Sequence, residues 1–309
     1  MMGAVPFAVK AMEAAQVPIV DSHIHLFDRN KPGGTFFPQK DDPVPGVSAL
    51  PSRYRGVIRS HGIVGAVVVE ASPWVEENQW ILDQAAKDTV ILGYVGFIDP
   101  GLPDFGRNLE RFHKNKLFRG IRYSNRNNQE GGAINDAIEN PGFVSNLKLL
   151  ADAGLSLDLG IAPDPSALLR VTDKVPSLRL VIPHLPNARM PEERAALEAY
   201  MGRLAELAKR PHVYMKLTEI IKRVSGATQN DLSLYKDRLD RLWDMFGEDR
   251  VMFGSDWPNS EHVATLGEVM SLGTAYIATK GSAVAEKVYW RNSAAAYRWT
   301  RREPGQPSA

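Results

Sequence analysis

The chain has 309 residues, and its 37 basic and 36 acidic residues give a formal net charge of +1. This balance, without runs of Lys or Arg, argues against nucleic-acid and membrane partners and favours a small-molecule substrate. Because the chain has no cysteine, disulfides and thiolate ligands are excluded, and any metal ion would be held by histidine and carboxylate groups. No apolar run approaches the ~20 residues that span a bilayer. The first 17 residues do not combine a basic start with a continuous apolar run, so we expect no secretory signal and a cytoplasmic location.

The first predicted element is a buried strand that starts at Ile19 and leads into His23 and His25. Side chains two residues apart on a strand point to the same face, so both imidazoles are aimed at one spot. Residues 28–50, which follow, are rich in glycine and proline and too long for a plain connection. Loops of this length inside a compact domain are usually functional or disordered. We interpret this one as a lid over the site.

Short apolar strands and helices then alternate along the chain. The further strands are predicted at residues 64–69, 90–97, 118–123, 155–161, 178–184, 213–217 and 251–253, and the helices at 52–61, 77–87, 103–114, 143–153, 165–175, 191–209 and 232–246. Eight strands with crossover helices predict parallel pairing and a closed (β/α)8 barrel, the TIM barrel of the α/β class. No Gly-x-Gly-x-x-Gly motif follows the first strand, which weakens an open nucleotide-binding sheet as the alternative. We expect a single barrel domain over residues 19–300, an N-terminal extension over 1–18 and a polar tail over 301–309.

Charged and imidazole side chains recur at the ends of these strands, and the carboxyl ends of barrel strands form the functional rim. The barrel would gather His23, His25, Glu70, Arg122, His184, Lys216 and Asp256 there. A carboxylate can take a proton from water, while imidazoles orient the water or polarise a carbonyl oxygen. With a divalent ion, His23, His25 and Asp256 would be the ligands, and the ion would lower the pKa of its water toward ~7. Either arrangement hydrolyses an acyl bond.

Three of the other candidates carry a structural alternative. Glu70 ends a strand, where a carboxylate is more often a solvated cap than a catalyst. Lys216 could be a solvated strand-end cation or could equally neutralise a substrate carboxylate. Trp257 follows a strand end and could wall the pocket, although tryptophans more often serve packing.

Six motifs in chain order resemble those of the amidohydrolase superfamily. They are His23-x-His25 after Val-Asp, Phe118-Arg119-Gly120-Ile121-Arg122, His184 after an apolar strand, Met215-Lys216-Leu217-Thr218, Met252-Phe253-Gly254-Ser255-Asp256-Trp257-Pro258 and Asn292-Ser293-Ala294-Ala295. Each motif is weak alone, but their occurrence together in this order is specific. The resemblance is to the lactonase branch, with 2-pyrone-4,6-dicarboxylate lactonase and the L-fucono- and L-rhamnonolactonases.

This resemblance implies a distorted (β/α)8 barrel that opens lactones or related cyclic esters by attack of water. It implies that Asp256 is the general base and that His23, His25 and His184 are the site histidines. A hydrolase of carboxylic esters with a small-molecule substrate, a lactone or a carboxylated ring, is therefore expected.

The resemblance also bears on substrate binding and metal use. In the pyrone lactonase branch, basic side chains after the fourth strand hold substrate carboxylates, and Arg122 and Arg126 stand in that place here. No lysine stands at the end of the fourth strand to be carbamylated, so a binuclear metal centre is not expected. Enzymes similar to this one either use one divalent ion, such as zinc or manganese, or use none, and both possibilities stay open.

Two competing functions are left by the sequence. One is a metal-dependent non-oxidative decarboxylase of the same superfamily, which usually has a further ligand histidine that is not found here. The other is a barrel without catalysis that serves as a binding module. The imidazoles of His23, His25 and His184 together with Asp256 argue against the second, because a non-catalytic rim has no need of them.

Overall fold

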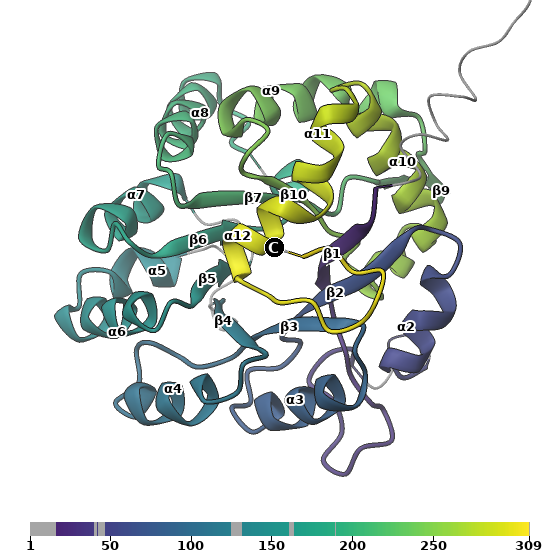
Figure 1. Ribbon diagram of the computed structural model, residues 1–309. Coiled ribbons are helices and arrows are strands. Elements are labelled where there is room, and N and C mark those ends of the chain that lie inside the picture. The colour runs from purple at the N-terminus through teal and green to yellow at the C-terminus, as the bar shows by residue number, and fades with distance from the viewer. Residues whose placement is uncertain are drawn as a thin grey trace, which may run out of the picture.

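The computed structural model describes residues 17–39, 42, 47–124, 132–160, 164–188 and 190–308. Eight parallel strands lie around a barrel in chain order, and helices surround them (Figure 1). The strands are β1 (Ile19–Ile24), β2 (Ile63–Val69), β3 (Ile91–Gly96), β4 (Phe118–Tyr123), β5 (Ser156–Leu159), β6 (Arg179–Ile182), β7 (Val213–Leu217) and β10 (Val251–Phe253). The single-domain (β/α)8 fold expected from the sequence is confirmed.

The helices follow the strands as crossovers and as additions at the barrel ends. The α-helices are α2 (Pro51–Ile58), α3 (Glu77–Lys87), α4 (Phe105–His113), α5 (Gly132–Ala137), α6 (Pro141–Asp152), α7 (Pro165–Lys174), α8 (Arg194–Ala208), α9 (Lys236–Phe246), α10 (Leu266–Ala278), α11 (Ser282–Glu286) and α12 (Asn292–Tyr297). Shorter elements are the hairpin of β8 (Arg223–Val224) and β9 (Ala227–Thr228), the 3-10 helices η1 (Leu185–Asn187), η2 (Leu232–Leu234) and η3 (Asn259–His262), and the π-helical η4 (Lys287–Arg291). None of the helices in the described ranges is long and apolar enough to cross a bilayer.

Most strands are near-continuous apolar runs because they are buried on both faces. β2 reads Ile-Val-Gly-Ala-Val-Val-Val, and six of its seven residues are buried. In a barrel, alternate side chains of a strand fill the interior and the others face the helices. Val20, Val67 and Leu92 belong to an inner cluster, which continues into Trp290 and Tyr297. α12 lies over the centre of the barrel in Figure 1, so it plugs one end.

The barrel closes between its first and last strands through polar contacts at the carboxyl ends. Ile24 and Trp257 form a parallel bridge. The Asp21 carboxylate accepts hydrogen bonds from the Ser255 backbone N–H at 2.8 Å and from the Ser255 hydroxyl at 2.5 Å. Burial raises the pKa of Asp21 to about 6, although these hydrogen bonds lower it in part. The closure thus fixes β1 and β10 side by side, and both lead into the predicted site.

The element boundaries differ from the predicted ones mainly at strand ends. β6 was expected to reach His184 but ends at Ile182, and His184 adopts a left-handed backbone with a φ of 59°. The helix expected from residue 191 begins at Arg194. Neither α5 nor the β8–β9 hairpin was predicted, because both are too short for a periodic pattern.

The predicted lid over residues 28–50 is only partly within the described ranges, and its role remains a prediction. Its two ends are joined, since Phe27 and Ala49 form an antiparallel bridge. The Phe37 ring lies 6.5 Å from the His25 ring, centroid to centroid. The loop therefore passes beside the end of β1.

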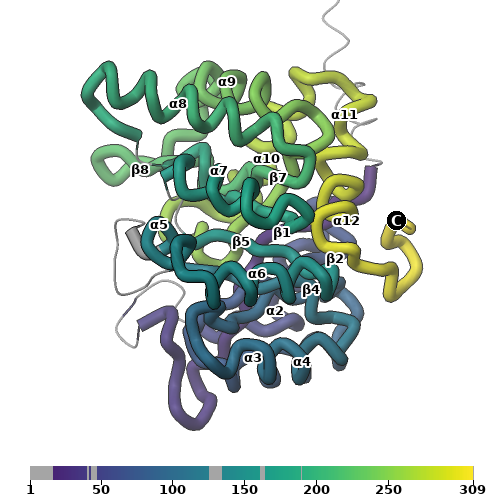
Figure 2. The backbone as a smooth tube through the Cα atoms, turned by 90° about the vertical axis from the view of Figure 1, so that its left-hand side faces the viewer, coloured from purple at the N-terminus to yellow at the C-terminus, as the bar shows by residue number. Residues whose placement is uncertain are grey.

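The C-terminal segment packs at the opposite end of the barrel. In the side view of Figure 2, α12 and the C-terminal residues lie at one end, whereas β8 and the loop after β1 lie at the other. Gln306 is buried, and its side-chain amide donates to the carbonyls of Val64 and Thr89. Residues 301–308 are thus fixed to the barrel and to the turn before β3.

Candidate active site

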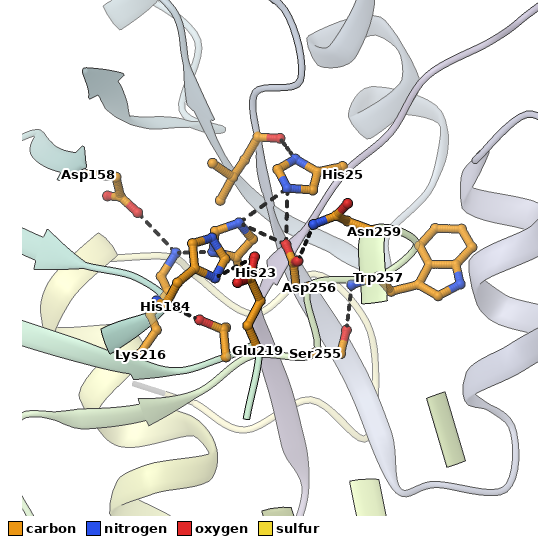
Figure 3. Close-up of polar contacts among 12 residues, drawn as sticks. His23, His25, Asp158, His184, Lys216, Glu219, Ser255, Asp256, Trp257 and Asn259 are labelled. Carbon is orange, nitrogen blue, oxygen red and sulfur yellow. Dashed lines mark hydrogen bonds and ion pairs between the residues drawn. The ribbon is translucent and has the colours of Figure 1, made fainter. Parts of the chain in front are cut away.

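Two histidines at the end of β1 face into the carboxyl-terminal mouth of the barrel (Figure 3). The His25 backbone N–H donates to the carbonyl of Trp257 at 2.7 Å, and its Nδ1 lies 2.9 Å from the carbonyl oxygen of Val69. Because a carbonyl only accepts, Nδ1 carries a proton and donates it to this oxygen. The Nε2 of His25 lies 3.3 Å from the Nε2 of His23. The two imidazoles therefore meet, as the His-x-His spacing predicts.

Asp256 joins them from the end of β10, with a φ of 60° and a fully buried carboxylate. Its Oδ2 accepts a hydrogen bond from the Asn259 amide at 2.6 Å. Its Oδ1 makes no hydrogen bond, although it lies 3.2 Å from His25 Nε2 and 3.4 Å from His23 Nε2. Burial alone would raise the pKa of Asp256, but His184, His25 and Asn259 outweigh it and hold that pKa below its usual range. The carboxylate is therefore ionised at neutral pH.

His184 completes the cluster from the turn after β6. Its backbone N–H donates to the Thr218 hydroxyl at 2.9 Å, which fixes the left-handed turn. Its ring lies 4.9 Å from the His23 ring, centroid to centroid, and its Nδ1 is 3.4 Å from Glu219 Oε1. Burial lowers the pKa of His184, and the charges of Glu219 and Asp256 oppose that shift. His184 is therefore brought to His23 and Asp256 despite lying beyond its strand.

Lys216 lies beneath this cluster on β7, and it is fully buried. Its Nζ donates to Asp158 Oδ2 at 2.9 Å and lies 3.3 Å from His23 Nδ1. The Tyr297 hydroxyl donates to the same Asp158 oxygen at 2.6 Å. Burial lowers the pKa of Lys216, while Asp158 raises it. The alternative of a solvated strand-end cation is wrong, because the ammonium group is enclosed with its counter-ion inside the barrel.

The remaining candidates are distributed around the cluster. Glu70 is buried rather than a solvated cap, and its Oε1 lies 4.0 Å from the Arg122 Nε. That Nε makes no hydrogen bond. Trp257 is fully buried, its Nε1 donates to Glu261 at 2.9 Å, and in Figure 3 its ring points away from the histidines, which favours the packing alternative. Arg126 lies outside the described residues.

The donor atoms of this cluster have the spacing of a metal site. His23, His184 and Asp256 each offer one ligand atom, and these atoms lie within 4.8 Å of one another. Asp256 Oδ1 and His184 Nδ1 are both buried without a hydrogen bond. Two nitrogens and one carboxylate oxygen match the protein ligands of an open zinc site. The residues fit such an ion, with His184 in the place that the sequence-based set gave to His25.

Three residues around the cluster were not selected from the sequence. Asn259 is the first residue of η3, which follows Asp256; Glu219 follows β7 beside Thr218, and Tyr297 lies on α12. Position just after a strand end could have pointed to the first two. No sequence signal identifies Tyr297, since its contact with Asp158 spans 139 residues.

The fold and this cluster define a class: (β/α)8 barrels with histidines and an aspartate at the carboxyl-terminal rim. A family model described as amidohydrolase matches residues 20–299, so the chain belongs to the amidohydrolase family. It is 26% identical over 250 residues to an L-fucono-1,5-lactonase of Burkholderia ambifaria, covering 81% of this chain and 83% of the relative. This distant relationship to lactonases agrees with the resemblance seen in the motifs.

Solved structures show the same fold. An amidohydrolase from Burkholderia multivorans, solved with bound zinc, is 22% identical with a TM-score of 0.78, over 91% of this chain and 99% of that one. A putative 2-pyrone-4,6-dicarboxylic acid hydrolase from Pseudomonas putida is 19% identical with a TM-score of 0.71, over 91% of this chain and 98% of that one. At this level of identity the likeness extends to the fold alone.

Proposed function

We propose that the protein hydrolyses a lactone or a related cyclic ester. The observation that carries this proposal is Asp256 Oδ1, an ionised, buried oxygen without a hydrogen bond that faces the imidazoles of His23 and His25. A base in that state can accept a proton from water. The distant lactonase relative supports the ester class of substrate.

The proposed mechanism is compatible with a divalent ion bound in the site. His23, His184 and Asp256 would hold it. When bound, the ion supplies Lewis-acid polarisation of a carbonyl oxygen and lowers the pKa of water.

The oxygen of a water molecule attacks the lactone carbonyl carbon as Asp256 Oδ1 takes one of its protons. The ring C–O bond then breaks, and the ring oxygen takes that proton from Asp256, so that one hydroxy acid leaves and the carboxylate is restored. Asn259 holds the other carboxylate oxygen at 2.6 Å and so fixes the direction of Oδ1. Arg122, whose buried Nε makes no hydrogen bond, would bind the carbonyl oxygen or a substrate carboxylate in this proposal.

The test is hydrolysis of a panel of unsubstituted lactones, sugar lactones and pyrone carboxylates. Proton release measures the rate, before and after a chelator has removed any bound divalent ion. Asp256→Asn keeps the shape of the side chain but removes the base. We expect kcat to fall by ~10²–10⁴, the usual effect of a positioned base. Asp152→Asn, an exposed residue of α6, is the matched control and should keep full activity.

Two results would count against the proposal. Unchanged turnover of every active lactone in Asp256→Asn would remove the base from the mechanism. Release of carbon dioxide from aromatic acids, without ring opening of any lactone, would favour the decarboxylase alternative.

A further inference from the structure

A cavity of about 220 Å³ adjoins the histidine and aspartate cluster between the ends of β7 and β10. Asp256 is part of its wall, as are Asn259, which binds Asp256, and Glu219, which faces His184. Figure 3 shows these two contacts on either side of the cluster. The cavity therefore opens beside the atoms proposed to react, and part of a substrate could enter it.

Most of the cavity wall is apolar. Its apolar side chains include Leu217, Ile220, Ile221, Phe253, Ala264 and Val269. All of these except Val269 are buried. An apolar group that leaves water for such a site is stabilised by about 25 cal/mol per Å² of its surface.

Apart from the Asp256 and Glu219 carboxylates, which face the histidines, several polar groups of the wall are occupied. Asn259 binds Asp256, and the ring of His262 is held between the Asn259 carbonyl at 2.8 Å and Asp42 at 3.0 Å. The Ser260 hydroxyl is buried, with 9% of the residue exposed, and makes no hydrogen bond. A polyhydroxylated arm would leave most of its hydroxyls unpaired here, which is costly. Away from the Asp256 and Glu219 carboxylates, the wall suits an apolar group with a polar atom near Ser260.

We infer that this cavity binds an apolar substituent of the substrate, an alkyl chain or a phenyl ring carried by the lactone. This inference rests on the proposed lactonase function and specifies its substrate class. A dry cavity of about 150 Å³ holds benzene, with its six carbons, so this one of about 220 Å³ has room for roughly nine carbons. The preferred substrates are alkyl- or aryl-substituted lactones, rather than the sugar lactone named for the Burkholderia ambifaria relative.

A series of δ-lactones with substituents from none to dodecyl at the ring carbon that bears the ester oxygen tests this inference. We expect kcat/KM to rise roughly fourfold per methylene, because each buried CH₂ contributes about that factor, and to level off at roughly nine carbons, where the cavity is full. Ala264→Leu fills the cavity with three more carbons. It should lower the ratio of kcat/KM for the nonyl lactone to that for the unsubstituted one by roughly 50-fold.

Two further variants show whether the chain-length dependence arises from this cavity. Ile221→Ala enlarges the same cavity and should move the plateau to longer chains. Ala275→Leu places the same substitution on an exposed position of α10 and should leave the chain-length profile unchanged. Thermal unfolding of each variant excludes a loss of fold as the cause.

Calorimetric binding of the same lactones to Asp256→Asn separates this inference from the proposed function. If no lactone is hydrolysed but affinity rises with chain length and falls in Ala264→Leu, the cavity site stands and lactone hydrolysis fails. If lactones are hydrolysed with no dependence on chain length, or with equal profiles in wild type and Ala264→Leu, the cavity inference is overturned.

Discussion

The side-chain amide of Asn259 sets the orientation of the Asp256 carboxylate. Asn259 donates to Asp256 Oδ2 at 2.6 Å, while Oδ1 has no hydrogen bond. A carboxylate held at one oxygen cannot rotate to offer the wrong one, so the base stays in the direction of the attacking water. Positioning of this kind contributes to catalysis because small displacements of reacting groups are costly.

Asn259→Ala should therefore lower kcat by ~10–100-fold, since a hydrogen bond to a charged group is worth about 1.5–3 kcal/mol. The variant keeps Asp256, so residual activity should remain well above that of Asp256→Asn. Steady-state kinetics on an active lactone measures kcat for both variants. Asn230→Ala is the control, because Asn230 makes an exposed amide-to-carboxylate hydrogen bond to Glu268 at 2.9 Å. A folded Asn259→Ala variant with unchanged kcat would contradict the role given to this amide.

At the scale of the elements, three alternate strands each place one side chain in the same layer of the barrel interior, next to the site. His23 comes from β1, Asp158 from β5 and Lys216 from β7, and α12 adds Tyr297 from below. In (β/α)8 barrels the inward side chains of alternate strands share a layer, which is why these residues meet. A buried charge is tolerated there only because its partner and hydrogen bonds accompany it.

Removal of one partner of this buried pair should be strongly destabilising. Lys216→Met leaves Asp158 buried without its counter-ion, and we expect the free energy of unfolding to fall by about 3–5 kcal/mol. The double variant Lys216→Met with Asp158→Asn should recover part of that loss, because no buried charge is left unpaired. Lys209→Met, which breaks an exposed ion pair with Glu206, should change stability by less than about 0.5 kcal/mol. Urea unfolding of all four proteins decides; equal values for Lys216→Met and wild type would show that the pair is not needed.

At the scale of the whole molecule, the eight strands were predictable because each is a compact apolar run bounded by helix patterns. The meeting of His23, His25 and Asp256 followed, since their strands are the first and last of a barrel. The partners of Lys216 could not be predicted, because its contact with Asp158 joins residues 58 positions apart and depends on strand tilt and layer. The place of His184 depends likewise on a left-handed turn that an apolar run does not reveal.

The residues that stabilise the fold and those of the proposed active site lie at opposite ends of the barrel axis. The site lies at one end, whereas the C-terminal segment packs at the other, where (β/α)8 barrels carry stability rather than catalysis (Figure 2). Arg302 Nη1 donates to three carbonyls that precede or begin β3: those of Ala85 at 2.6 Å, Asp88 at 3.1 Å and Ile91 at 2.6 Å. This guanidinium joins the end of α3, the following turn and the start of β3.

Arg302→Ala should accordingly lower the free energy of unfolding by about 2–4 kcal/mol, because three carbonyls lose a charged donor. Its effect on KM should be small, since the substitution lies at the end opposite the site. Arg301→Ala is a matched control one residue away, because Arg301 is exposed and its Nε donates to the Glu303 carbonyl in an exposed hydrogen bond. We expect it to change stability by no more than about 0.5 kcal/mol. Urea unfolding together with lactone kinetics tests the separation, and a large change in KM with unchanged stability in Arg302→Ala would show that the two ends of the barrel are coupled.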